Sequence, residues 1–287
     1  MPSSQCSSLL MTPLAKQVAN TTSSTAKPER LTPPLKWAGG KRWLVPHLQH
    51  TWQKYSDRRL VEPFCGGLAI ALGLQPEEAL LNDINPHVVN FYKWLQRGLN
   101  FDIEAKYNRE FYYAQRNEFN RLIQNGEADS NKAAQLFYYL NRTGYNGLCR
   151  FNQKGGFNVP FGRYKTVNYN PNFSVYQSVM SPWQFTCGDF ESLKIKKKDL
   201  IYADPPYDVE FRQYSQNGFE WQDQVRLAKW LAKQKCPVIA SNQATVRIVE
   251  LYRNLGFEIK FYDAPRRISC NGDRQPAQEI IAFKGFS

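Results

Sequence analysis

The chain has 287 residues, of which 42% are hydrophobic, so it can bury a sizeable core and is too apolar for wholesale disorder. Lys and Arg outnumber Asp and Glu by 37 to 25, and the net charge of +12 favours a polyanionic partner, although a basic protein can simply be soluble. No apolar run approaches the ~20 residues that a membrane span needs, so we expect no membrane partner.

The cysteines and the first segment suggest where the protein works. Six cysteines and three histidines are scattered along the chain without a CxxC pair. This spacing gives no zinc signature, and we expect reduced thiols in a cytoplasmic protein without a metal. Residues 1–30 are rich in Ser, Thr and Pro, which predicts a disordered tail rather than a signal peptide.

The first predicted elements form a nucleotide-site layout. Residues 59–62 suit a short buried strand, residues 63–67 a glycine-bearing turn and residues 68–74 a helix, and a second strand at 79–81 leads to Asp83. An acid at the end of this second strand suits contact with ribose hydroxyls. The turn lacks the full GxGxxG cradle for a pyrophosphate, so a nucleoside-like ligand such as S-adenosylmethionine fits better than NAD.

Residues 91–185 differ in composition and predict an insertion, with helices over 109–124 and 130–141 followed by polar loops. The loops contain Asn141–Arg150 (NRTGYNGLCR) and Phe157–Arg163 (FNVPFGR). Arginine can grip guanine with two hydrogen bonds, Leu and Pro can pack on a thymine methyl, and an exposed aromatic ring can enter the base stack. A polar surface loop is the alternative interpretation of the same residues.

Alternating α/β patterning returns after residue 186. The predicted elements are a strand at 199–203, a helix at 222–235, a strand at 237–240, a helix at 247–254 and an antiparallel pair at 259–262 and 279–283. The first of these strands ends at Asp204-Pro205-Pro206-Tyr207 (DPPY). Open α/β sheets bind ligands at the carboxyl ends of their strands, which is where this motif lies.

The DPPY motif suits chemistry on an exocyclic amine. Such an amine on a purine is a poor nucleophile because its lone pair is delocalised into the ring. Asp204 can accept one amine hydrogen and the carbonyl of Pro205 the other, while two prolines stiffen the loop. Tyr207 offers a flat face on which a base can stack. Taken alone, the four residues are more simply interpreted as a proline-rich turn capped by Asp.

The stretch from Leu35 to Arg42 (LKWAGGKR) combines two glycines with an aromatic side chain and several cations. Such a loop can approach an anionic ligand closely. It lacks the GxxxxGK[ST] spacing of a P-loop, and in isolation a basic loop docked by Trp37 is the simpler interpretation.

Together these motifs resemble the Dam family of DNA adenine-N6 methyltransferases in the alpha arrangement, with the cofactor motif first, the recognition domain next and DPPY last. The matches are LKWAGGK, VEPF, DIN, LNRTGYNGLCRFN, FNVPFGRYK and DPPY, in family order. The resemblance implies an α/β, Rossmann-like class I S-adenosylmethionine-dependent methyltransferase sheet with an inserted, mainly helical and loop target-recognition domain. We assign residues 31–90 and 186–287 to the catalytic domain and 91–185 to recognition of double-stranded DNA.

The resemblance also implies the cofactor and catalytic residues. The S-adenosylmethionine pocket would be lined by Trp37, Lys41, Phe64, Asp83 and Asp204. By a weaker match, the adenine of the cofactor would be contacted by Asp189 and Phe190. A flipped adenine base would be held by Asp204, Pro205, Pro206 and Tyr207. No metal is expected, because the leaving group is a neutral thioether.

The resemblance finally implies a GATC target. Positions that read bases in GATC-specific members match Leu148, Arg150 and Pro160. Positions that touch the DNA or fill the vacated stack match Lys36, Tyr145 and Asn146. The chain departs from the family at Thr143, where an aromatic residue is common, and at the turn after Phe64, where CGGLA replaces a more usual VGAGS-like sequence.

Two other functions stay open at this point. One is a methyltransferase for cytosine N4, RNA or protein glutamine, although such enzymes more often resemble SPPY or NPPY types. The other is a DNA-binding regulator with an inactive methyltransferase fold, against which the intact DPPY motif, Asp83 and Lys41 argue. No obligatory protein partner is evident from the sequence.

Overall fold

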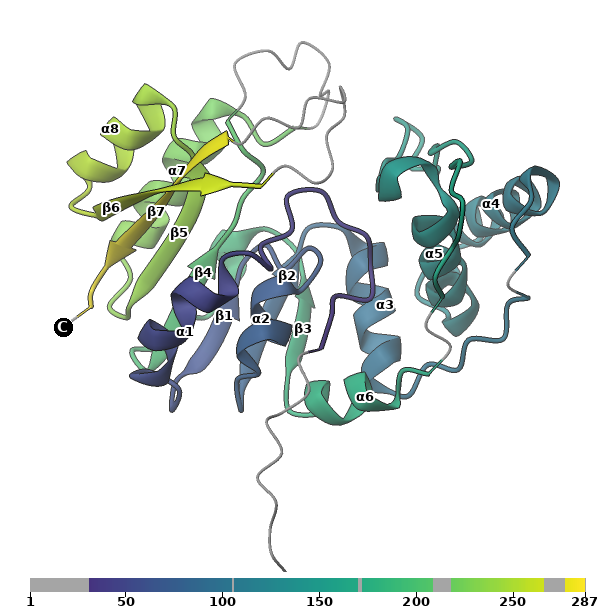
Figure 1. Cartoon of the computed structure of the whole chain (residues 1–287), viewed down its shortest axis with the longest axis horizontal. Helices are drawn as coiled ribbons and strands as arrows, with labels where there is room; N and C mark the ends of the chain where they lie inside the picture. Colours follow the sequence, from purple (N-terminus) through teal and green to yellow (C-terminus); the bar gives the residue numbers. More distant parts are fainter. Residues whose placement is uncertain (1–30, 105, 170–171, 209–217, 266–276, 287) are drawn as a thin grey trace, which may run out of the picture. The chain divides into compact units, whose positions relative to one another are not determined.

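The computed structural model describes residues 31–104, 106–169, 172–208, 218–265 and 277–286, so the tail expected at residues 1–30 lies outside the described residues. The strands are β1 (Arg59–Glu62), β2 (Ala79–Asp83), β3 (Gln184–Cys187), β4 (Asp199–Ala203), β5 (Val238–Gln243), β6 (Glu258–Ala264) and β7 (Ala277–Lys284). Within the described residues they form a seven-stranded sheet in the order β3-β2-β1-β4-β5-β7-β6 (Figure 1). The strands β1 to β5 are parallel, and β7 runs antiparallel between β5 and β6.

Several of the helices begin at a capping side chain or a proline. They are α1 (Val45–Gln53), α2 (Ala69–Leu74), α3 (Pro86–Gln96), α4 (Arg109–Gln124), α5 (Asn131–Thr143), α6 (Ser174–Met180), α7 (Trp221–Ala232) and α8 (Val246–Asn254), with 3-10 turns η1 (Tyr145–Gly147) and η2 (Phe190–Ser192). Asn85 caps α3 by accepting a hydrogen bond from the amide of His87. Within the described ranges, no helix combines the length and apolar character of a membrane span.

The sheet is buried on both faces, because successive residues along a strand belong to two different hydrophobic cores. Leu60 and Leu200 belong to a core with side chains of α1, α2 and α3, whereas Val61 and Ile201 belong to one with side chains of α7 and α8. The first core continues through α3 into α5 and α4. A sheet buried on both faces explains the continuous apolar runs of its central strands.

The structure confirms the predicted α/β class and the predicted elements, with ends shifted by a few residues. The sequence patterns did not indicate α1, α3, α6 or β3. In α3, even polar residues such as His87 and Asn90 are buried, so the helix lacks the polar face that reveals an amphipathic pattern. This helix also crosses the boundary at residue 90, and the role of residues 91–185 in DNA recognition stays a prediction.

His87 joins α3 to the loop after α5. Its ring stacks on Phe151 at 4.7 Å between centroids and meets Phe119 edge-on at 5.2 Å. Burial lowers the pKa of His87 to about 4. The imidazole is therefore neutral in the folded protein at neutral pH.

The His87→Phe variant should lose part of the acid sensitivity of the fold. Between pH 6.5 and 4, His87 takes up a proton in the unfolded chain but not in the folded chain. The contribution of His87 to stability is therefore full above pH 6.5 and falls as the pH drops toward 4. Urea unfolding at pH 7 and at pH 5 measures the free energy of unfolding. The decrease between the two pH values should be about 2 kcal/mol larger in the wild type than in the variant. Equal losses would show that His87 takes up its proton without penalty.

Candidate active site

The DPPY segment leaves the carboxyl end of β4, between the parallel strands β1 and β5. The register pairs Ala203 with Ala240, which brings Ser241 beside Asp204. The hydroxyl of Ser241 donates to Oδ1 of Asp204 at 2.8 Å and lies 3.1 Å from the hydroxyl of Tyr202. The carboxylate of Asp204 is thus oriented by the neighbouring strand.

Lys41 brings a buried positive charge to this carboxylate. It is 3% exposed, and its Nζ lies 3.1 Å from Oδ1 of Asp204 and 3.8 Å from Oε2 of Glu279. It also donates to the carbonyl of Gly39 at 2.7 Å. A buried ammonium group is tolerated only when it is paired and hydrogen-bonded, and these groups meet that condition.

Tyr207 is held at its hydroxyl end by the last strand. Its hydroxyl donates to Oε2 of Glu279 on β7 at 2.7 Å, and Lys41 Nζ lies 4.6 Å from the centre of its ring. Burial, with the charges of Asp204 and Glu279, raises the pKa of Tyr207 well above its ordinary value. The ring therefore stays neutral and fixed at the edge of the sheet.

The glycine turn after β1 is shaped to receive Trp37. Gly66 has a φ of +42°, and a Cβ at this position would lie 2.6 Å from the indole nitrogen of Trp37. A Cβ at Gly67 would lie 2.8 Å from the Cβ of Trp37. Both positions therefore require glycine, one for its conformation and both for the close approach.

Asp83, at the end of β2, closes the same turn. Its Oδ2 accepts from the amide of Gly66 at 2.9 Å and its Oδ1 from the amide of Asn85 at 2.9 Å. Burial raises the pKa of Asp83, while these two hydrogen bonds oppose the shift. A carboxylate has about four lone pairs, so Asp83 can still accept from a ligand hydroxyl beside its backbone amide partners.

Four further residues at this edge were given no role from the sequence. They are Glu62, Ile84, Ser241 and Glu279. Ile84 is 70% exposed directly after Asp83, and burial raises the pKa of Glu62 well above its ordinary value. The proximity of Ser241 and Glu279 to the DPPY segment follows from strand register, which no local sequence signal reveals.

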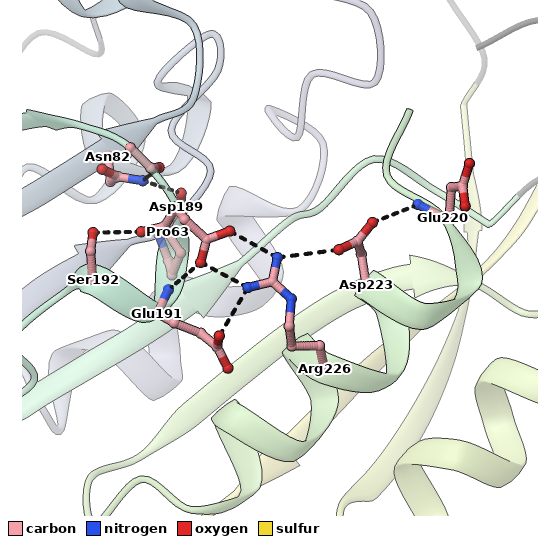
Figure 2. A network of polar contacts seen from close by, with 9 residues as sticks. Pro63, Asn82, Asp189, Glu191, Ser192, Glu220, Asp223 and Arg226 are labelled. Carbon is pink, nitrogen blue, oxygen red and sulfur yellow. Dashed lines mark hydrogen bonds and ion pairs between the residues drawn. The ribbon is translucent and has the colours of Figure 1, made fainter. Parts of the chain in front are cut away.

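Asn82 ties together the two loops that would flank a ligand. Its amide nitrogen donates to the carbonyl of Pro63 at 3.0 Å and to that of Gly188 at 2.9 Å (Figure 2). These carbonyls immediately precede Phe64 and Asp189. The structure therefore brings Phe64 and Phe190 together, with ring centroids 5.7 Å apart.

Asp189 is engaged by an arginine from α7. Arg226 contacts both of its oxygens at 2.8 Å and reaches Glu191 and Asp223 as well (Figure 2). The guanidinium carbon of Arg226 lies 4.2 Å from the ring centre of Phe190. The hydrogen bond from Arg226 lowers the pKa of Asp189. The expected contact of Asp189 with a cofactor stays a prediction.

Apart from Lys36, the predicted DNA-contacting residues lie on two adjoining loops. The amide of Tyr145 donates to the carbonyl of Pro160 at 2.9 Å, and Gly144 forms a bridge with Phe161. Tyr145 is 46% exposed, and Asn146 has a φ of +51°. These two loops therefore present Tyr145 and Pro160 close to each other.

Arg150 projects from the same region with a fixed geometry. It is exposed, its Nε donates to Oδ1 of Asn158 at 2.8 Å, and its Nη2 donates to the carbonyl of Asn158 at 3.2 Å. Leu148 is partly buried against the main core, two residues before it. The guanidinium is thus held from one side and open to solvent.

Lys36 is more deeply placed than its predicted DNA contact suggests. Its ammonium donates to the carbonyl of Arg142 at 2.8 Å and lies 3.5 Å from the ring centre of Tyr164. Burial, with the charge of Arg142, lowers the pKa of Lys36 to about 8. The ammonium contacts protein groups in this structure, and its role toward DNA stays a prediction.

The chain is similar to proteins that methylate adenine in DNA. The family model described as D12 class N6 adenine-specific DNA methyltransferase matches residues 37–268. The retron Ec67 DNA adenine methylase of Escherichia coli is 37% identical over 88% of this chain and 90% of its own length. The DNA adenine methylase of Vibrio cholerae serotype O1 is 35% identical over 87% of this chain and 94% of its own length.

Two further similarities are partial. The DNA N-6-adenine-methyltransferase of Escherichia phage P1 is 35% identical over 86% of this chain, and this chain spans 35% of its length. The N-terminal domain of human METTL16, solved in complex with SAH, is 12% identical, with 90% of this chain and 74% of that domain covered and a TM-score of 0.38.

Gly66→Ala should destabilise the fold through Trp37. The matched control is Gly126→Ala, where φ is +75° and a Cβ would meet nothing within 4 Å. Both variants introduce the strain of a positive φ, but only in Gly66→Ala does the added Cβ also contact the indole of Trp37. Chemical unfolding should show Gly66→Ala to be about 1–3 kcal/mol less stable than Gly126→Ala. Equal effects would mean that the turn does not depend on close packing against Trp37.

Proposed function

Since this chain belongs to the family of D12 class N6 adenine-specific DNA methyltransferases, we propose that it methylates adenine within double-stranded GATC, with S-adenosylmethionine as donor and the base flipped into the DPPY pocket. The observation that carries this proposal is the carboxylate of Asp204. It lies at the carboxyl edge of the sheet with Oδ1 engaged by Lys41 and Ser241. The adenine specificity of the family sets aside a cytosine, RNA or protein acceptor. The intact DPPY motif and the pairing of Asp204 with Lys41 argue against an inactive regulator.

The residues around Asp83 fit S-adenosylmethionine. The lone pairs left on Asp83 suit ribose hydroxyls, and the exposed side chain of Ile84 suits the flat face of an adenine ring. Trp37 packs on the same turn and Phe190 packs on Phe64, while Lys41 lies beside Asp204. The donor would supply a methyl group on a cationic sulfur and leave as a neutral thioether, so no metal is required to accept charge.

Asp204 and Pro205 would polarise the target amine. Within the described ranges the contacts to Asp204 fall on Oδ1, which leaves Oδ2 to accept one amine hydrogen. The carbonyl of Pro205 would accept the other. Lys41 and Ser241 hold the carboxylate before the substrate arrives, so little reorganisation is needed when charge develops on nitrogen.

Tyr207 would stack on the flipped adenine. The anchoring of its hydroxyl by Glu279 keeps the ring in one orientation, so the base meets a preformed face. Flipping costs a few kcal/mol of stacking and pairing, and the exposed ring of Tyr145 would fill the gap in the duplex. The net charge of +12 supports the binding of DNA as substrate.

Arg150, Leu148 and Pro160 would read the GATC bases. Arg150 is the residue type that grips guanine O6 and N7, and Leu148 and Pro160 suit a thymine methyl. Asn146 and Lys36 would contact the backbone of the DNA. A cytoplasmic location and the lack of an obligatory protein partner stay predictions.

Asp204→Ala should abolish turnover while sparing DNA affinity. The variant loses the acceptor for the amine, and the change should lower kcat by at least about 10²-fold. Labelled methyl transfer to a GATC duplex measures kcat, and a gel-shift assay measures affinity. Glu258→Ala, which removes an exposed carboxylate on β6, is the control and should behave as the wild type. Normal methylation by Asp204→Ala would exclude the proposed site.

Arg150→Ala should relax specificity at one G·C pair. The expected loss of discrimination is about 1–3 kcal/mol at that pair. The measurement is kcat/KM on GATC and on duplexes with single substitutions. Arg163→Ala removes an exposed arginine nearby and should weaken all duplexes alike. A variant at Arg150 with intact sequence preference would contradict the assignment.

A further inference from the structure

The DPPY segment has a shortage of backbone donors. Pro205 and Pro206 carry no N–H, so this part of the loop can be anchored only through its carbonyl groups. The carbonyl of Pro206 has such an anchor, because Nε2 of Gln224 donates to it at 2.7 Å. Gln224 lies in the first turn of α7. This helix packs on one face of the sheet, whereas α1, α2 and α3 pack on the other.

Gln224 is itself held by a second amide. Nδ2 of Asn242 on β5 donates to Oε1 of Gln224 at 2.9 Å. Oδ1 of Asn242 in turn accepts from the backbone amide of Gln243 at 2.8 Å. The three donors point the same way, from β5 through α7 to Pro206, and such chains of hydrogen bonds strengthen one another.

Both side chains are buried, at 1% exposure for Gln224 and 0% for Asn242. A buried amide costs free energy unless its polar atoms find partners. Here each partner also limits the orientation of the next, so neither amide can turn over without breaking the series. The result is a rigid connection between a core strand and the catalytic loop.

We propose that Gln224 and Asn242 are positioning residues that hold the carbonyl of Pro206. By holding this carbonyl they orient Tyr207 and leave the carbonyl of Pro205 for the substrate amine. The carbonyl of Pro206 and the amide of Tyr207 share one peptide plane, so holding the oxygen sets the direction from which the Tyr207 side chain starts. Glu279 holds the other end of that side chain at its hydroxyl. This inference rests on the proposed catalytic role of residues 204–207.

The first test compares Gln224→Met with Gln222→Met on the exposed face of the same helix. Loss of the donor should lower kcat on a GATC duplex by about 10- to 100-fold, because small misplacements of reacting groups cost rates of this order. The dissociation constants for S-adenosylmethionine and for the duplex should stay close to those of the control. Losses of kcat and of both affinities in proportion would overturn the inference in favour of a merely structural role.

The second test uses Gln224→Glu, which can regain the missing donor by protonation. A neutral carboxyl group keeps an acceptor for Asn242 and offers an O–H to Pro206, whereas the carboxylate offers none. The ratio of the kcat of the variant to that of the wild type should therefore rise as pH is lowered from 8.5 to 6. A ratio independent of pH would contradict the inference, even if the Met variant proves too unstable to assay.

The third test asks whether the two amides act as a unit. Asn242→Leu should lower kcat in the same sense, and the double variant with Gln224→Met should lose little more than the worse single variant. Fully additive losses would overturn the inference. If Asp204→Ala kept its activity, the proposed function would fail, whereas an inactive Asp204→Ala beside a fully active Gln224→Met would refute only the role of Gln224.

Discussion

The organisation of the site depends on the burial of one ammonium group, that of Lys41. Burying a charge is costly unless opposite charges and hydrogen-bond acceptors surround it, and breaking such a pair leaves an uncompensated charge. Lys41 comes from the loop before α1, Asp204 from the end of β4 and Glu279 from β7. Pairing these three residues therefore fixes three distant segments of the chain around a single point, where Tyr207 also lies.

The loop that carries Lys41 also connects the site to the predicted recognition region. The amide of Lys36 donates to the side chain of Asn141, which returns a hydrogen bond to the carbonyl of Lys36. One residue further, Trp37 packs on the glycine turn beside Asp83. The contact between the region that would read DNA and the region that would hold the donor is thus made by neighbouring residues of one loop.

Carboxyl groups along this edge differ in their affinity for a proton because their surroundings differ. Arg226 lowers the pKa of Asp189, whereas burial raises the pKa of Asp83 and of Glu62. An edge with several carboxyl groups suits a donor with a cationic sulfur, and it agrees with the proposed use of S-adenosylmethionine. Burial and pairing, rather than residue type, set the direction in which each pKa shifts.

The sequence alone determined the α/β class, most of the strands and helices and the segments that gather at the edge of the sheet. These features depend on local periodicity, turn residues and motifs, which neighbouring residues encode. Only the tertiary structure revealed α3, whose burial hides its pattern, and the partners that hold the motifs, including Ser241, Glu279 and Gln224. Those contacts join residues 18 to 72 positions apart, and they arise from strand register and helix packing, which local residue preferences do not specify.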